Sequence, residues 1–214
     1  MLIAPSILSV DQKKLPQVIR ELEQANVRML HLDVMDGQFV KNKTFDAAFI
    51  ANLKKNTSLI FDTHLMIVNP EASYMEYVDT KSAYVTFHYE ATNNVLKLIK
   101  DIKAVGVKVG ISIKPYVPAE VLEPYLPYLD LILVMSVEPG KGGQTFMMNA
   151  LDKIKYLNQK RNQKGYFYLI EVDGGINLET AELVSKAGAD IVVVGTYLMN
   201  HPQMTKAIKS LKAL

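Results

Sequence analysis

The sequence contains no cysteine among its 214 residues. Disulfide bonds, iron–sulfur clusters and zinc sites built on thiolates are therefore excluded. The N-terminal residues lack the basic segment and long apolar run of a secretory signal, and no apolar run in the chain is long enough to cross a bilayer. We therefore expect a cytoplasmic protein without a membrane partner.

The chain also lacks a large excess of either charge. It has 24 basic and 22 acidic residues, and this net charge of +2 gives no reason to expect a nucleic-acid partner. No linker, low-complexity segment or block of like charge divides the sequence. We therefore expect one domain over residues 1–214.

Short apolar runs, typical of buried strands, alternate with amphipathic segments. Leu15, Val18, Ile19 and Leu22, for example, recur at steps of three and four residues, which predicts a helix face. The predicted strands are 2–6, 27–35, 59–66, 84–88, 107–113, 129–137, 167–172 and 191–194. The predicted helices cover 15–22, 47–53, a segment opening at Pro70, 95–102, 118–126, 147–162, 178–187 and 203–211.

Eight strand–helix units in this length predict a (β/α)8 TIM barrel. A doubly wound open sheet is the competing architecture. Polar residues collect at the C-terminal ends of several strands, where barrel active sites are built, and no GxGxxG motif follows the first strand. Both observations favour the barrel.

The segment 31–40 carries the strongest chemical signal. His31, Asp33 and Met35 are two residues apart, so an extended strand places them on one face. An imidazole and a carboxylate at the end of an apolar strand are costly to bury unless a metal ion or a proton transfer uses them. We therefore predict a functional site at this strand end.

A second histidine repeats this arrangement. Asp62 and His64 close the third strand, and Asp173 closes the seventh. Histidine nitrogen and carboxylate oxygen together suit zinc or another divalent transition metal, although the spacing leaves open which carboxylates are ligands. His88 can instead simply bond to Glu90.

Glycine-rich loops follow three consecutive strands, at 138–146, 173–177 and 195–197. Glycine lets backbone N–H groups approach an anion closely, and barrels commonly bind phosphate after strands seven and eight. Ordinary turn glycines are the alternative. Met35, Met66 and Met135 end strands at the same level, as core residues or as an apolar lining of the site.

Several motifs together resemble the ribulose-phosphate 3-epimerase family. They occur in family order over nearly the whole chain. They are APSILS (4–9), HLDVMDGQFV (31–40), DTHLM (62–66), VMSVEPGKGGQ (134–144), VDGGI (172–176) and AGADIVVVGT (187–196).

The resemblance implies the roles of individual residues. One divalent metal ion, zinc first and iron, manganese or cobalt as alternatives, is held by His31, Asp33, His64 and Asp173, and Asp33 and Asp173 also form the acid–base pair. The residues implied to contact substrate are Ser6, His64, Gly142, Gly143, Gln144, Gly174, Gly175, Gly195 and Thr196. We expect Met35, Met66 and Met135, which end strands at the same level, to contact it as well.

The resemblance further implies an isomerase of the pentose phosphate pathway that forms a homo-oligomer. It would epimerise D-ribulose 5-phosphate at C3 to D-xylulose 5-phosphate by two-base proton transfer through a cis-enediolate. D-Allulose-6-phosphate 3-epimerase is the nearest alternative, and a non-catalytic phosphosugar-binding barrel is another. Related barrel decarboxylases carry Asp-x-Lys-x-x-Asp, and the absence of lysine between His31 and Asp36 argues against that activity.

Four residues depart from the family pattern. Lys41 replaces a usual proline, Asp46 a glycine and Lys141 a phenylalanine, and Lys114 opens a segment that differs from the usual Asn-Pro-Gly-Thr-Pro. None of them is an implied ligand or base. All are expected in loops near the barrel mouth, so they leave open which ketose phosphate is the substrate.

Overall fold

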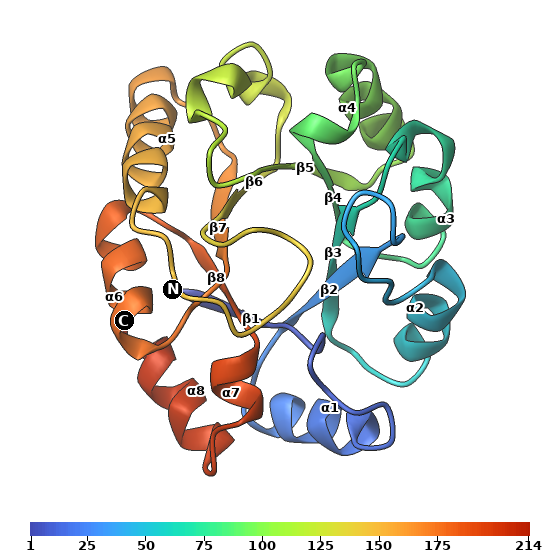
Figure 1. The fold of residues 1–214 in the computed structure, drawn as a ribbon, viewed down its shortest axis with the longest axis vertical. Coiled ribbons are helices and arrows are strands. Elements are labelled where there is room, and N and C mark those ends of the chain that lie inside the picture. Colours follow the sequence, from blue (N-terminus) through green and yellow to red (C-terminus); the bar gives the residue numbers. More distant parts are fainter.

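A computed structural model describes residues 1–214 as eight parallel strands arranged around one axis, with helices on the outside (Figure 1). The strands are β1 (Leu2–Pro5), β2 (Met29–Met35), β3 (Ile60–Met66), β4 (Tyr84–His88), β5 (Lys108–Ile113), β6 (Leu131–Met135), β7 (Leu169–Asp173) and β8 (Ile191–Val194). β1 pairs with β8, so the sheet curls back on itself. This confirms the barrel and excludes the open sheet.

The barrel closes between β1 and β2 through a single parallel bridge, which joins Ser6 to His31. The Ser6 hydroxyl also donates to Asp33 Oδ2 at 2.6 Å. The seam of the barrel is therefore made by residues that the sequence predicted for the site.

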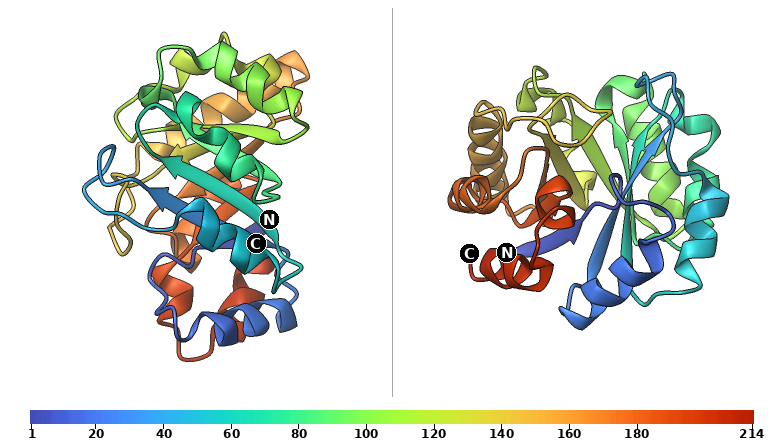
Figure 2. Two further views of the ribbon diagram at one scale, coloured as in Figure 1. Left: turned by 90° about the vertical axis from the view of Figure 1, so that its right-hand side faces the viewer. Right: turned by 60° about the horizontal axis from the view of Figure 1, so that its bottom comes forward.

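Helices follow the strands around the barrel (Figures 1 and 2). They are α1 (Leu15–Gln24), α2 (Ala47–Lys54), α3 (Tyr74–Val78), α4 (Val95–Ala104), α5 (Ala150–Lys164), α6 (Leu178–Ala187), α7 (Thr196–Met199) and α8 (Met204–Lys212). Asp46, which departs from the family pattern, caps α2 by accepting a hydrogen bond from the Phe49 N–H. No helix combines the length and apolar character needed to span a membrane.

Some predicted elements differ from those observed. The helix expected over 118–126 is two 3₁₀ turns, η3 (Ala119–Leu122) and η4 (Leu126–Tyr128), because Pro124 and Pro127 lack the N–H groups that a continuous α-helix needs. The segment opening at Pro70 begins as a 3₁₀ turn before α3. Phe167 is 96% exposed, and its strand starts two residues later.

The side chains of each strand alternate between two sides. One set, including Phe61, Ile132 and Ile170, packs in a large apolar core with residues of the surrounding helices. The other set faces the barrel interior, where a smaller apolar cluster contains Leu131 and Leu133. His31 and Asp62 are fully buried at neighbouring interior positions. The interior is therefore apolar along β6 and polar along β2 and β3.

Candidate active site

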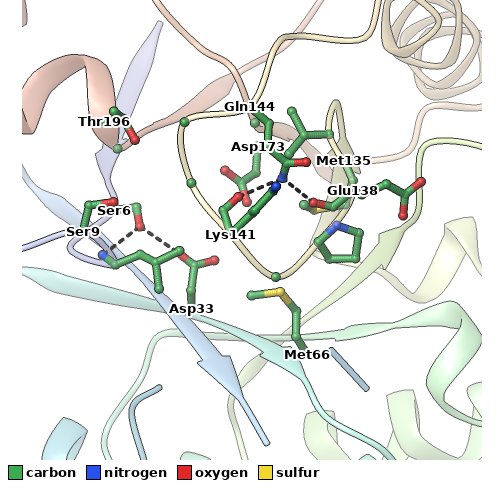
Figure 3. Close-up of a pocket in the computed structure, with 18 of the residues that line it drawn as sticks. Ser6, Ser9, Asp33, Met66, Met135, Glu138, Lys141, Gln144, Asp173 and Thr196 are labelled. Atoms are coloured by element: carbon green, nitrogen blue, oxygen red, sulfur yellow. Dashed lines mark hydrogen bonds between the residues drawn. The ribbon is translucent and has the colours of Figure 1, made fainter. Parts of the chain in front are cut away.

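A cavity lined by 19 residues opens at the C-terminal ends of the strands (Figure 3). Most of the residues predicted to contact substrate lie in its wall. They are Ser6, Met35, Met66, Met135, Gly142, Gly143, Gln144, Gly174, Gly195 and Thr196.

The predicted acid–base pair also lies in this wall. Asp33 comes from β2 and Asp173 from β7, two strands that are separated around the barrel by β1 and β8 (Figure 3). Ligand atoms of these two carboxylates and of His31 and His64 all lie within 4.8 Å of one another. Barrel closure thus brings together four groups that are far apart in the sequence.

The two histidines lie behind the wall, with fully buried side chains. His31 Nε2 and His64 Nδ1 each lie 3.5 Å from Asp33 Oδ1, and neither nitrogen has a hydrogen-bond partner. A buried polar atom without a partner is costly. Two such nitrogens directed at the same carboxylate oxygen fit a divalent cation bound by nitrogen and oxygen ligands.

The opposite side of the His31 ring is occupied by Asp62. The distance from His31 Nδ1 to Asp62 Oδ2 is 2.6 Å, so the carboxylate fixes the orientation of the ring. The sequence left open which carboxylates belong to the metal cluster. The geometry assigns Asp62 to the rear of His31, whereas Asp33 and Asp173 lie on the cavity side.

Glu171 lies below this group in the barrel interior. Its Oε1 is 3.9 Å from His31 Nδ1, and neither carboxyl oxygen has a hydrogen-bond partner. Burial, followed by the nearby charge of Asp62, raises the pKa of Glu171 well above its usual value. Sequence reasoning assigned no role to Glu171, although it shares a strand face with Asp173.

The two wall carboxylates have different environments. Burial opposes ionisation of Asp33, but the adjacent His31 and His64 outweigh it and hold its pKa well below the usual value. Burial and then the charge of Asp33 raise the pKa of Asp173 to about 7. Two carboxyl groups whose pKa values are pushed apart in this way are suited to act as a base and an acid.

The other end of the cavity is built from loop backbone. The N–H groups of Gly143, Gly174 and Gly195 donate no hydrogen bond within the chain. A Cβ on Gly142 would lie 3.2 Å from both Ser9 Oγ and Thr196 Oγ1, so the loop after β6 passes close to two hydroxyl groups. Free N–H groups beside hydroxyls suit an anion such as phosphate.

Two residues of this region differ from the sequence-based picture. Gly175 does not line the cavity; a Cβ there would collide with the backbone of Phe146 and Gln144, so this glycine lets two loops pack together. Ser9 lines the cavity and was not predicted. Ser9 lies within the motif APSILS (4–9), and its place in that motif could have indicated that it belongs to the site.

Three lysines lie around the mouth. Lys141 is exposed and lines the cavity, and Lys41 is exposed on the loop after β2. The ammonium of Lys114 lies 4.3 Å from the centre of the Phe39 ring. None of the three forms an ion pair with an acidic side chain.

Comparisons with known proteins agree with this geometry. A family model described as the ribulose-phosphate 3 epimerase family matches residues 2–199. The chain is 43% identical to a ribulose-phosphate 3-epimerase of Treponema pallidum, over 91% of this chain and 89% of that protein. It is 38% identical to a protein of the same name from Bacillus subtilis, over 98% of this chain and 97% of the relative.

Solved structures with low sequence identity share the fold. A 3-hexulose-6-phosphate synthase matches with a TM-score of 0.75 at 17% identity, over 100% of this chain and 99% of that chain. A 3-keto-L-gulonate-6-phosphate decarboxylase from Vibrio cholerae matches with a TM-score of 0.73 at 10% identity, over 99% and 95% of the two chains. At these identities the similarity concerns the barrel alone.

Proposed function

Because the chain belongs to the ribulose-phosphate 3-epimerase family, we propose that it interconverts D-ribulose 5-phosphate and D-xylulose 5-phosphate by epimerisation at C3. The observation that carries this proposal is the pair Asp33 and Asp173. The two carboxyl groups lie in one cavity with pKa values held on opposite sides of the usual range. Epimerisation next to a carbonyl needs one group that removes a proton and a second that returns one.

In one direction, ionised Asp33 takes the proton from C3 of the sugar. The electron pair of the C3–H bond forms the C2–C3 double bond of a cis-enediolate. Asp173, whose pKa lies near 7, then returns a proton to C3 from the other face of the sugar. The two residues exchange roles in the reverse direction, so the enzyme can act on either epimer.

Ser6 supports the proton transfer by holding Asp33. Its hydroxyl donates to Asp33 Oδ2, which leaves Oδ1 directed toward the two histidines. A fixed carboxylate reaches C3 with less loss of side-chain freedom.

His31, Asp33, His64 and Asp173 would together hold the divalent metal ion, with zinc as the first expectation and iron, manganese or cobalt as alternatives. When bound, the ion would supply Lewis-acid stabilisation of the negative charge that develops on the sugar oxygens. The fit rests on the two buried histidine nitrogens that lack a partner.

The remaining wall residues bind and shield the sugar. Met35, Met66 and Met135 are at most 2% exposed, so they present an apolar surface that limits water around the reactive intermediate. The free N–H groups of the loops after β6, β7 and β8 would bind the phosphate. Binding energy from this remote group then positions C3 between the two carboxylates.

The test is a coupled assay of the purified protein with D-ribulose 5-phosphate and D-allulose 6-phosphate side by side, with metal content measured on the same sample. We expect faster turnover of the five-carbon sugar and solvent deuterium at its C3. Preference for the six-carbon sugar would instead assign the chain to the allulose-phosphate activity. Binding without turnover or proton exchange, with metal fully bound, would contradict the epimerase assignment.

The metal site is tested by His31→Ala, which should remove the bound metal. His201→Ala is the matched control, because His201 lies at the start of the segment before α8, away from the cavity. The control should retain both metal and activity. Full metal content in His31→Ala would contradict the proposed ligand set.

A further inference from the structure

A fourth histidine lies directly behind the proposed metal site. His88 ends β4 and its side chain is fully buried. Its Nε2 is 2.9 Å from Nε2 of His64, and the two ring centres are 4.9 Å apart. His88 is outside the metal cluster and does not line the cavity, so its only route to the chemistry is through His64.

Glu90 occupies the other nitrogen of His88. The distance from His88 Nδ1 to Glu90 Oε2 is 3.2 Å, and the second carboxylate oxygen accepts the backbone N–H of Lys114 at 2.8 Å. An ionised carboxylate only accepts hydrogen bonds, so His88 Nδ1 must carry the hydrogen. Glu90 therefore determines the tautomer of His88.

The same argument then applies to His64. Two ring nitrogens 2.9 Å apart can share only one hydrogen, so one must donate and the other accept. With its hydrogen on Nδ1, neutral His88 presents a bare Nε2 and accepts from the Nε2–H of His64. The bare nitrogen of His64 is then Nδ1, which is the atom directed at Asp33 without a partner.

We propose that His88 and Glu90 are positioning residues that hold His64 with a bare Nδ1 directed at the metal. This inference rests on the proposed metal site. Asp62 determines the tautomer of His31 directly, through a contact of 2.6 Å between Asp62 Oδ2 and His31 Nδ1. No carboxylate contacts His64 Nε2. The tautomer of His64 is therefore set indirectly, because Glu90 determines the tautomer of His88 and His88 in turn determines that of His64.

Two loops at the mouth hold this pair in place. The Phe39 ring lies 4.7 Å from the His88 ring at an interplanar angle of 40°. The Lys114 ammonium lies over the Phe39 ring, and its backbone N–H binds Glu90. The loops after β2 and β5 thus restrict the movement of His88 and Glu90.

Glu90→Gln tests the tautomer without removing a hydrogen bond. The amide oxygen of glutamine can accept the Lys114 N–H while its NH₂ donates to His88 Nδ1. His88 then carries its hydrogen on Nε2, and His64 must place its own hydrogen on Nδ1, against the metal. We expect zinc affinity to fall about 10- to 100-fold, as for other residues that support a metal-ligating histidine.

His88→Phe and His88→Gln form a second pair of variants. Phenylalanine keeps a ring beside Phe39 but cannot accept the His64 N–H, so zinc affinity should fall about as far as in Glu90→Gln. Glutamine can present an amide oxygen in place of Nε2 and accept the His64 N–H. The zinc affinity of His88→Gln should therefore be much closer to that of the unmodified protein than the affinity of His88→Phe is. His201→Gln, outside the site, should change nothing.

Zinc affinity is measured by chelator competition on folded protein, with the thermal midpoint of each metal-free variant as the control for folding. Nitrogen-15 NMR of the histidine rings in metal-free protein reads the tautomer directly, and we expect His64 to carry hydrogen on Nε2. Hydrogen on Nδ1 would overturn the inference, as would zinc affinities of Glu90→Gln and His88→Phe within about twofold of the unmodified protein.

The two proposals fail in different ways. If the unmodified protein binds no divalent metal, the proposed metal site is wrong, and the NMR measurement still decides whether Glu90 and His88 set the tautomer of His64. If the unmodified protein binds zinc and the variants bind it equally well, the metal site stands and the positioning role is wrong.

Discussion

The two ends of the cavity are formed by different chemical groups, side chains at one end and backbone N–H groups at the other. At the end of the proposed acid–base chemistry, side chains of β2, β3 and β7 converge, and His31 and His64 are fully buried. At the proposed phosphate end, the groups are backbone N–H donors of loops, and the loop residues Gly142 and Gly143 are exposed. The proposed proton transfer thus depends on which side chains are present, whereas anion binding depends on the conformation of the loop backbone.

This difference predicts how each end responds to mutation. Replacing a side chain at the metal end removes a proton acceptor or a ligand, so it should lower kcat or metal affinity. Changing the backbone at the phosphate end weakens a remote contact, so it should mainly raise KM.

Asp173→Asn should give the largest effect. Asparagine keeps the shape of the side chain but cannot carry the proton, so kcat should fall by about 10³- to 10⁴-fold while KM changes only a few-fold. Steady-state kinetics and deuterium incorporation at C3 provide the measurement. Asp152→Asn, on the exposed surface of α5, is the control. A kcat within tenfold of the unmodified enzyme would assign the proton transfer to another residue.

Metal affinity should depend on pH. For His31, the charges of Asp62 and Asp33 outweigh the effect of burial and raise its pKa well above the usual value. At neutral pH the His31 ring is therefore protonated in the metal-free protein, and metal binding must displace one proton from it. We expect zinc affinity to fall by about tenfold for each pH unit below the pKa of His31.

Chelator competition between about pH 6 and pH 8 measures this slope. A zinc affinity that is independent of pH would show that His31 loses no proton on metal binding.

Gly143→Ala should separate the phosphate end from the metal end. Gly143 has φ +73°, so alanine is strained there, but an added Cβ meets only Thr196 at ordinary contact distance and no atom must shift. The methyl group beside the free N–H should raise KM by about tenfold and leave kcat nearly unchanged. Gly106→Ala is a matched control, since Gly106 has φ +81° and an added Cβ meets nothing. A lower kcat without a change in KM would contradict the division of the cavity.

Lys141→Gln should have the smallest effect. Lys141 is exposed at the cavity mouth, where its charge attracts an anionic substrate. We expect kcat/KM to fall by about two- to fivefold at low ionic strength and the difference to vanish at high salt. Lys155→Gln, on the exposed face of α5, should change neither value. A salt-independent effect would indicate direct contact with the substrate.

The fold could be predicted largely because the strands are short, apolar and regularly spaced. The bounds of β4, β8 and α6 match the prediction residue for residue. The predicted helix over 118–126 was wrong because Pro124 and Pro127 interrupt a segment whose hydrophobic pattern is helical. The four-residue helix α7 was also missed, because a single turn leaves no periodic pattern to detect.

The positions of the candidate site residues could be predicted where polar side chains coincide with a strand end, as for His31 and His64. The contacts of Asp62 with His31 and of His88 with His64 could not be predicted, because they depend on which ring nitrogen faces which neighbour. Sequence spacing places His88 near Glu90, but only the packing of β3 beside β4 brings His88 to His64.

The closing seam between β1 and β2 has a consequence for how the barrel folds. β1 pairs along its length with β8, from which it is distant in sequence, and only Ser6 joins it to β2 by a backbone bridge. Closing the barrel therefore requires contacts between residues far apart in the sequence, which form slowly because a long loop must be closed first. We expect the contact of Ser6 with Asp33 to form late in folding, together with the pairing of β1 and β8.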